Sequence, residues 1–101
     1  MARKQSKQAR SRATAERVIP KEILAKEIAS ILRDRELTQT EAARIMNDAP
    51  SQVSLVVTGK LRGFSTERLL RMLARLGRDV EIVIRATNGR QRAGRISVVR
   101  K

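Results

Sequence analysis

The sequence predicts a mainly α protein, a compact bundle of about four to five helices followed by one C-terminal β-strand or two. Three observations lead to this fold class. Apolar residues recur three and four positions apart between Leu24 and Leu76, which is the spacing of a helix face. Helix start and stop residues divide this region into four stretches. After Gly77 the apolar residues alternate instead, which is the pattern of a strand.

The first predicted helix starts at Pro20 and ends at about Arg35. Proline suits a first helical turn, because the N–H that it lacks would have no partner there. The apolar positions of this helix are Leu24, Ile28, Ile31 and Leu32.

Two short helices are expected next. Thr38 and Glu41 form a capping box, in which each side chain accepts from the other residue's backbone N–H and so begins the second helix. A break at residues 47–49 precedes Pro50, which starts a third helix that Gly59 ends. The apolar stripes of the two helices are Ala42, Ile45 and Met46 in the second and Val53, Val56 and Val57 in the third.

A fourth helix and one or two strands complete the predicted fold. Ser65 caps the helix, Gly77 ends it, and its apolar face is Leu69, Leu70, Leu73 and Leu76. Residues 80–85 then alternate as a strand, Asn88-Gly89 is a turn signal, and residues 96–99 are a candidate second strand. One or two strands are not stable alone, so we expect the strand to pair with the same strand of a second copy. The residues assigned to this dimerisation are Val80, Ile82, Val83 and Ile84.

The composition excludes several classes of function. The chain has 101 residues, a formal net charge of +13, one aromatic residue, and neither Cys nor His. Thiol chemistry, disulfides, the usual zinc sites and the commonest general base are therefore absent, and we expect no enzyme, no cofactor and no metal. Few aromatics also argue against a platform for single-stranded nucleic acid. No apolar run is long enough to cross a membrane, and we expect a cytoplasmic protein with a polyanionic partner.

The charge is concentrated at the two ends. Residues 1–19 hold six Lys or Arg and one Glu, and residues 87–101 hold five Lys or Arg and no acid. The first segment has too little apolar content to fold alone, and we expect it to be disordered or to become ordered only on a partner. The predicted organisation is thus a basic tail over 1–19, a helical domain over 20–78, and C-terminal strands with a basic tail over 79–101.

Ala43, Asn47, Val53 and Val56 form the pattern that carries the functional prediction. A helix-turn-helix needs a small residue where its helices touch, a turn residue that tolerates positive φ, and two apolar anchors on the second helix. These four residues meet those needs and predict a helix-turn-helix over 38–59. The alternative is a small helical bundle with a sharp corner and no DNA-binding role. The basic charge and the lack of a catalytic set favour binding of double-stranded DNA.

The outward face of the third helix suits a major groove. With the valines inward, Ser51 and Leu55 point outward, flanked by Gln52, Ser54 and Thr58. Glutamine can pair with adenine, serine with several base edges, and Leu55 can meet a thymine methyl. The predicted base contacts are therefore Ser51, Gln52, Ser54 and Leu55. The alternative is an ordinary solvated polar face.

Phosphate contacts are predicted around this helix. Thr38 and Gln39 lie at a helix N-terminus, where free N–H groups and the helix dipole favour anions. Thr58, Lys60 and Arg62 are assigned as further phosphate contacts, although the two basic residues can equally be ordinary surface charge. The fourth helix carries a stripe of Arg68, Arg71, Arg75 and Arg78. That stripe is either a binding surface or a solvated face, and we favour the solvated face.

Residues 37–99 resemble a known family. The resemblance is carried by LTQTEAARIMN at 37–47, QVS at 52–54, GK at 59–60, FSTERLLRMLARLGRDVEIVIR at 64–85 and GRISVV at 94–99. These segments resemble the XRE-type (Cro/repressor-like) helix-turn-helix proteins that include HigA-like antitoxins. The resemblance implies a homodimer with C-terminal strands near the two-fold axis, an inverted-repeat operator and a third helix in the major groove. It also implies a RelE/HigB-like toxin as an operon partner.

The predicted function is that of a sequence-specific regulator of transcription, a repressor of its own promoter that binds double-stranded DNA as a homodimer. A bacterial cytoplasmic location near the nucleoid follows from that function. The alternative is an antitoxin whose main role is to bind and neutralise a RelE/HigB-like toxin. A small basic RNA-binding protein would explain size and charge, but neither the helix-turn-helix spacing nor the predicted strand.

Overall fold

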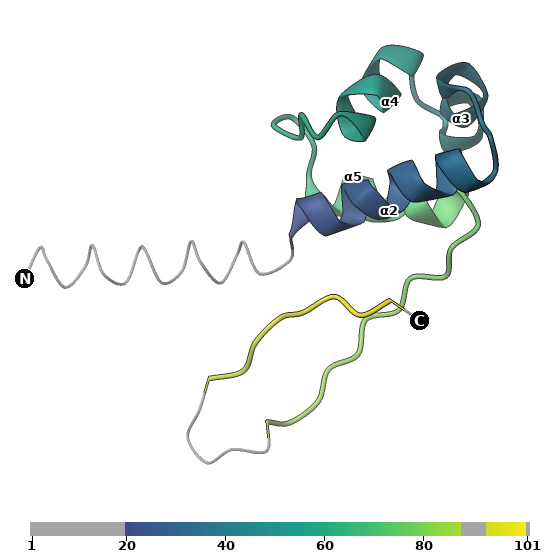
Figure 1. Ribbon diagram of the computed structural model, residues 1–101. Coiled ribbons are helices and arrows are strands. Elements are labelled where there is room, and N and C mark those ends of the chain that lie inside the picture. Colours follow the sequence, from purple (N-terminus) through teal and green to yellow (C-terminus); the bar gives the residue numbers. More distant parts are fainter. Residues whose placement is uncertain (1–19, 88–92, 101) are drawn as a thin grey trace, which may run out of the picture. The chain divides into compact units, whose positions relative to one another are not determined.

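The computed structural model describes residues 20–87 and 93–100 (Figure 1). Its helices are α2 (Lys21–Asp34), α3 (Gln39–Met46), α4 (Pro50–Val57) and α5 (Thr66–Arg75). All of them belong to one unit, Lys21–Glu81, whereas the described residues from Ile82 onward belong to a second unit. The order and bounds of these helices confirm the predicted helical part of the fold.

An apolar core joins the helices of the first unit. The most deeply buried large side chains include Ile28 of α2, Val53 and Val56 of α4, and Leu69 of α5. Burying a side chain of this size contributes about 1.5–3 kcal/mol. α2 packs on α5 and α4, and α3 packs on α4 and α5. The short helix α4 is thus held by two neighbours along one side.

The helix ends follow the predicted chemistry. The Thr38 hydroxyl accepts from the Glu41 N–H at 3.0 Å, and the Glu41 carboxylate accepts from the Thr38 N–H at 2.8 Å. Ser65 caps α5 by accepting from the Arg68 N–H. Gly59 and Gly77 have φ values of 80° and 95°, so both lie in the left-handed region that ends many helices. These contacts confirm the capping box, the cap at Ser65 and both glycine terminators.

Three predicted core positions are less buried than their spacing indicates. Ile45 is 36% exposed, and Val57 and Leu70 are only half-buried. Met72 of α5 is buried instead, and so are Leu61 and Phe64 of the loop before α5. The loop residues close the core between α4 and α5, a role that helical periodicity cannot indicate because they are not in a helix.

The predicted C-terminal strands are not present in this structure. Residues 78–87 and 93–100 have neither helix nor strand, although Figure 1 draws them as extended chain. A strand exists only when its backbone hydrogen-bonds to a second strand, and the alternating pattern at Val80–Arg85 does not supply that partner. The two segments do approach at one point, because a Cβ built on Gly94 would lie 3.4 Å from Thr87 Cγ2. The predicted turn at Asn88-Gly89 and the predicted tail over 1–19 lie outside the described residues.

Candidate nucleic-acid interface

The corner between α3 and α4 has the predicted geometry. Asn47 adopts the left-handed conformation, with φ 59° and ψ 52°, and its N–H donates to the carbonyls of Ala43 and Arg44. The Asp48 N–H also donates to the Ala43 carbonyl, at 2.8 Å. Ala43 itself is buried, and α3 packs on α4. A small contact residue and a positive-φ turn residue therefore produce the sharp bend of a helix-turn-helix.

Helix α4 presents the predicted contact residues on its outer side. Val53 and Val56 are buried and attach the helix to the core. Ser51 is exposed, whereas Gln52, Ser54 and Leu55 are half-buried. The helix begins at Pro50 after Ala49, which supplies no side-chain cap. Ser51 is thus exposed to solvent, whereas the other three predicted base contacts are partly covered.

Gln52 is joined to α5 by a hydrogen bond that sequence analysis did not predict. Its Oε1 accepts from Arg68 Nη2 at 3.2 Å, and the same nitrogen forms an ion pair with Asp48 Oδ1 at 2.8 Å. The Arg68 guanidinium also lies over the Phe64 ring, 4.4 Å from its centroid. Asp48 and Gln52 precede Arg68 by twenty and sixteen residues. No local sequence pattern joins positions so far apart, so only folding brings them together.

The other arginines of the predicted stripe have different surroundings. Arg71 pairs with Glu67 at 2.8 Å, one turn earlier on the exposed face of α5. Arg78, beyond the helix, approaches Glu27 of α2 at 3.8 Å. The stripe is therefore not one uniform basic surface, because Arg68 turns toward α4 whereas Arg71 remains at the surface.

The predicted phosphate contacts differ in whether their side chains have a hydrogen-bond donor that is not already used within the protein. The Thr38 hydroxyl oxygen accepts from the Glu41 N–H, and the hydroxyl also hydrogen-bonds to the Glu41 carboxylate, which it can do only by donating its proton. The Thr58 hydroxyl donates to the Ser54 carbonyl at 2.8 Å, so its single proton is already used. Gln39, Lys60 and Arg62 are exposed. Both threonine hydroxyl protons thus already have a partner within the protein.

The capping box also perturbs Glu41. The backbone N–H of Thr38 lowers the pKa of this carboxyl, and the Thr38 side chain and the Arg44 charge lower it further. Glu41 is exposed, and the lowering comes from hydrogen bonding to the charged form of the carboxyl.

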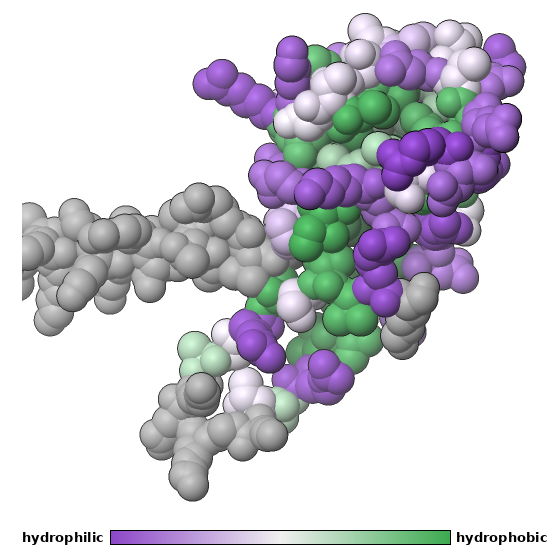
Figure 2. Space-filling view, viewed as in Figure 1, coloured by the Kyte–Doolittle hydropathy of each residue, from purple (hydrophilic) through white to green (hydrophobic). Residues whose placement is uncertain are grey.

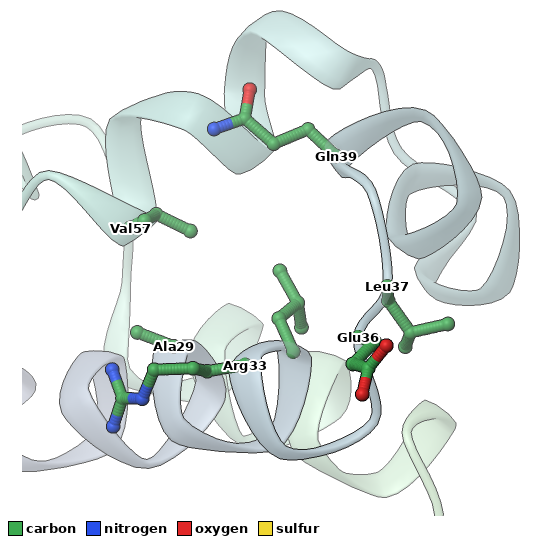
Figure 3. A pocket seen from close by; sticks show the side chains of 7 residues that line it. Ala29, Arg33, Glu36, Leu37, Gln39 and Val57 are labelled. Carbon is green, nitrogen blue, oxygen red and sulfur yellow. The ribbon is translucent and has the colours of Figure 1, made fainter.

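A shallow hollow of about 330 Å³ lies beside this surface, between the end of α2, the start of α3 and the end of α4 (Figure 3). Its lining residues are Ala29, Leu32, Arg33, Glu36, Leu37, Gln39 and Val57. Figure 2 shows apolar surface between α2 and α4 in this region, with hydrophilic residues around it. Arg33, Glu36 and Gln39 are the polar residues of this lining, and the other four residues are apolar.

The described residues offer neither a metal site nor a membrane-spanning helix. They contain no group of three or more His, Cys, Asp or Glu side chains that could hold a metal ion. Among their helices, none combines the length and the apolar character that a membrane crossing requires.

Comparisons with known proteins identify the family. A family model described as a helix-turn-helix domain matches residues 7–85. A solved structure named as an XRE family transcriptional regulator is 39% identical, covers 87% of this chain and 99% of its own, and superposes with a TM-score of 0.78. No curated protein matches the sequence. Together with the α3–α4 geometry, these matches show that the chain belongs to the XRE-type helix-turn-helix family, whose members are DNA-binding regulators of transcription.

Proposed function

We propose that the protein is a sequence-specific repressor that binds double-stranded DNA as a homodimer and represses its own promoter. One observation carries the proposal: α4 is anchored through the buried Val53 and Val56, whereas Ser51 is exposed and Gln52, Ser54 and Leu55 are partly exposed. A helix held in this way can enter a major groove without losing its packing. The proposal includes no enzymatic activity and no cofactor, and it places the protein in the cytoplasm.

Backbone contacts would set the position of α4 on the duplex. The first N–H groups of α3 are available donors, and Gln39 lies at that helix start. Lys60 and Arg62 would contact phosphates beyond the other end of α4. These groups recognise the phosphate backbone, which is the same for every sequence, so they contribute affinity and register rather than base preference.

The C-terminal segment is the proposed dimer interface. The exposed fractions of Val80, Ile82, Val83 and Ile84 are 42%, 78%, 63% and 91%. Four neighbouring apolar residues exposed to this degree in a single chain favour burial against a second copy. Pairing of two such segments would supply the backbone partners that one chain lacks.

Fluorescence anisotropy tests the DNA-binding proposal. The full chain is titrated with a labelled duplex from its own promoter and with a scrambled duplex of the same length and composition, at about 150 mM salt. We expect tighter binding to the promoter and an inverted repeat with half-site centres about 34 Å apart, or a multiple of that distance. Equal affinity for the two duplexes would refute sequence-specific recognition.

An antitoxin role is the second candidate function. The exposed apolar C-terminal segment favours it, because the same residues could pair with a toxin instead of a second copy. The test is whether an adjacent short reading frame encodes a RelE/HigB-like protein that co-purifies with this chain. An unrelated neighbour, or a neighbour that does not bind, would refute the antitoxin role and leave the repressor proposal unaffected.

A further inference from the structure

We propose that Arg68 is a positioning residue that sets which chemical group Gln52 presents to a base pair. This inference rests on the proposed function and adds a determinant of specificity from outside the helix-turn-helix. Arg68 belongs to α5, whereas the predicted base contacts all belong to α4.

Three contacts hold the Arg68 guanidinium in place. Its Nη2 donates to Asp48 Oδ1 at 2.8 Å and to Gln52 Oε1 at 3.2 Å, and its plane covers the Phe64 ring. The side chains of Arg68 and Asp48 are 34% and 16% exposed, and Phe64 is buried. An arginine fixed by a carboxylate and a ring is a rigid donor rather than a mobile surface charge.

The chemistry of the two side chains determines the orientation of the amide. A guanidinium has five N–H donors and no acceptor, so only the oxygen of the Gln52 amide can face it. The amide nitrogen, with its two N–H groups, is then the end that remains available for another partner. A free glutamine can present either end to a base edge, and Arg68 removes that choice.

The fixed amide selects base edges by their acceptors. The purine N7 atoms, guanine O6 and thymine O4 accept hydrogen bonds in the major groove, whereas cytosine N4 donates. We therefore expect Gln52 to favour acceptor-bearing edges, and that preference to depend on Arg68.

The test compares base preference rather than affinity. Selection from a random duplex library first defines the preferred site of the full chain, and the base pair whose preference changes in Gln52→Ala is the one that Gln52 contacts. We expect Arg68→Met to lose preference at that same base pair by about fivefold or more, as Gln52→Ala does. The double variant should lose no more than Gln52→Ala alone, because Arg68 acts through Gln52.

Arg71→Met is the matched control. It removes the same charge from the same helix, where Arg71 pairs with the exposed Glu67 and not with a predicted base contact among the described residues, and it should weaken all duplexes without changing the base ranking. A purely structural Arg68 would lower the melting temperature of Arg68→Met but leave the base ranking unchanged. That result would overturn the positioning role and leave the repressor proposal standing. A wild-type chain without any base preference would refute both.

Gln52→Glu provides a second variant, in which Arg68 and Asp48 are both unchanged. Its carboxylate can still accept from Arg68, but it presents only acceptors to the duplex. We expect the preference at the Gln52 base pair to shift toward an edge with a donor, such as the N4 amine of cytosine. An unchanged preference in this variant would overturn the inference, even if Arg68→Met failed to fold.

Discussion

Asn47 and Glu36 are the non-glycine residues of the described chain that have positive φ, at 59° and 54°. Asn tolerates this conformation because its short polar side chain can bond locally, whereas for most other residues it costs roughly 1–2 kcal/mol. Glu36 is held there by the turn after α2, in which the Leu37 N–H donates to the Leu32 carbonyl at 2.8 Å. The turn residue of the helix-turn-helix is thus a favourable choice, and the turn before α3 carries strain.

Gly59 allows a test of backbone conformation without a change in packing. A Cβ at Gly59 or at Gly63 would meet no atom within 4 Å, but only Gly59, at φ 80°, has positive φ. We expect Gly59→Ala to lower the free energy of unfolding by about 1–2 kcal/mol in urea denaturation, because alanine is strained there. Gly63→Ala is the matched control and should not destabilise the protein. Equal effects of the two substitutions would contradict this explanation.

Helices α3 and α4 have eight residues each, and they are stabilised in different ways. Helices of this length are not stable alone in water. α3 has a complete capping box, whereas α4 has no side-chain cap and depends on Val53 and Val56 in the core. The helix proposed to meet DNA is therefore positioned by tertiary packing more than by its own sequence.

The capping box of α3 should make stability depend on pH. The pKa of Glu41 in the folded protein lies below its ordinary value of 4.5. The ionised carboxylate therefore stabilises the fold above pH 4.5, and this stabilisation is lost as the pH falls through the lowered pKa. Glu41→Gln keeps an acceptor oxygen but cannot ionise. We expect the difference in free energy of unfolding between wild type and Glu41→Gln, measured by urea denaturation at each pH, to become smaller as the pH falls. A difference that stays constant with pH would exclude a contribution from the ionised Glu41 carboxylate.

The whole chain combines a helical unit with a basic, apolar C-terminal segment. The described C-terminal residues are nearly all exposed, including Ile82, Ile84 and Val99. Figure 2 shows hydrophobic surface along this segment beyond α5. Exposed apolar residues favour association with another chain, which is why the dimer proposal rests on this segment.

Charges placed in that segment should prevent dimerisation. We expect wild type to be a dimer in light scattering and the double variant Ile82→Lys, Ile84→Lys to be a monomer, because two buried cations would lack partners. Its melting temperature should then show whether the helical unit remains folded. The control carries Ala86→Lys and Thr87→Lys, which add the same charge nearby and should leave the dimer intact. A monomeric wild type would contradict the interface.

Removal of residues 1–19 tests the contribution of the basic tail to DNA binding. The segment has six Lys or Arg. For each phosphate contact that is lost with the tail, the slope of the logarithm of the binding constant against the logarithm of the salt concentration should become less steep by about 0.9. Anisotropy over a range of salt concentrations should show weaker binding to all duplexes and an unchanged ranking of sequences. A changed ranking would show that the tail reads bases.

Local chemistry explains which parts of the fold were predictable. Thr38, Asn47, Gly59 and Ser65 act through backbone groups within a few residues of themselves, so a single sequence window contains everything needed to place the helix ends. Buried valines at helical spacing likewise indicate which side of α4 faces the core. These features were sufficient to predict four helices and the helix-turn-helix corner.

Longer-range features needed the folded chain. Strand formation at Val80–Arg85 depends on a pairing partner, and alternation alone does not provide one. Arg68 also contacts Asp48 and Gln52, which are distant in sequence. The packing of α5 against α3 brings these residues together. Hydrogen bonds between residues that are close in sequence can be inferred from the sequence itself. A contact between side chains that are far apart in sequence can form only after the helices have packed together.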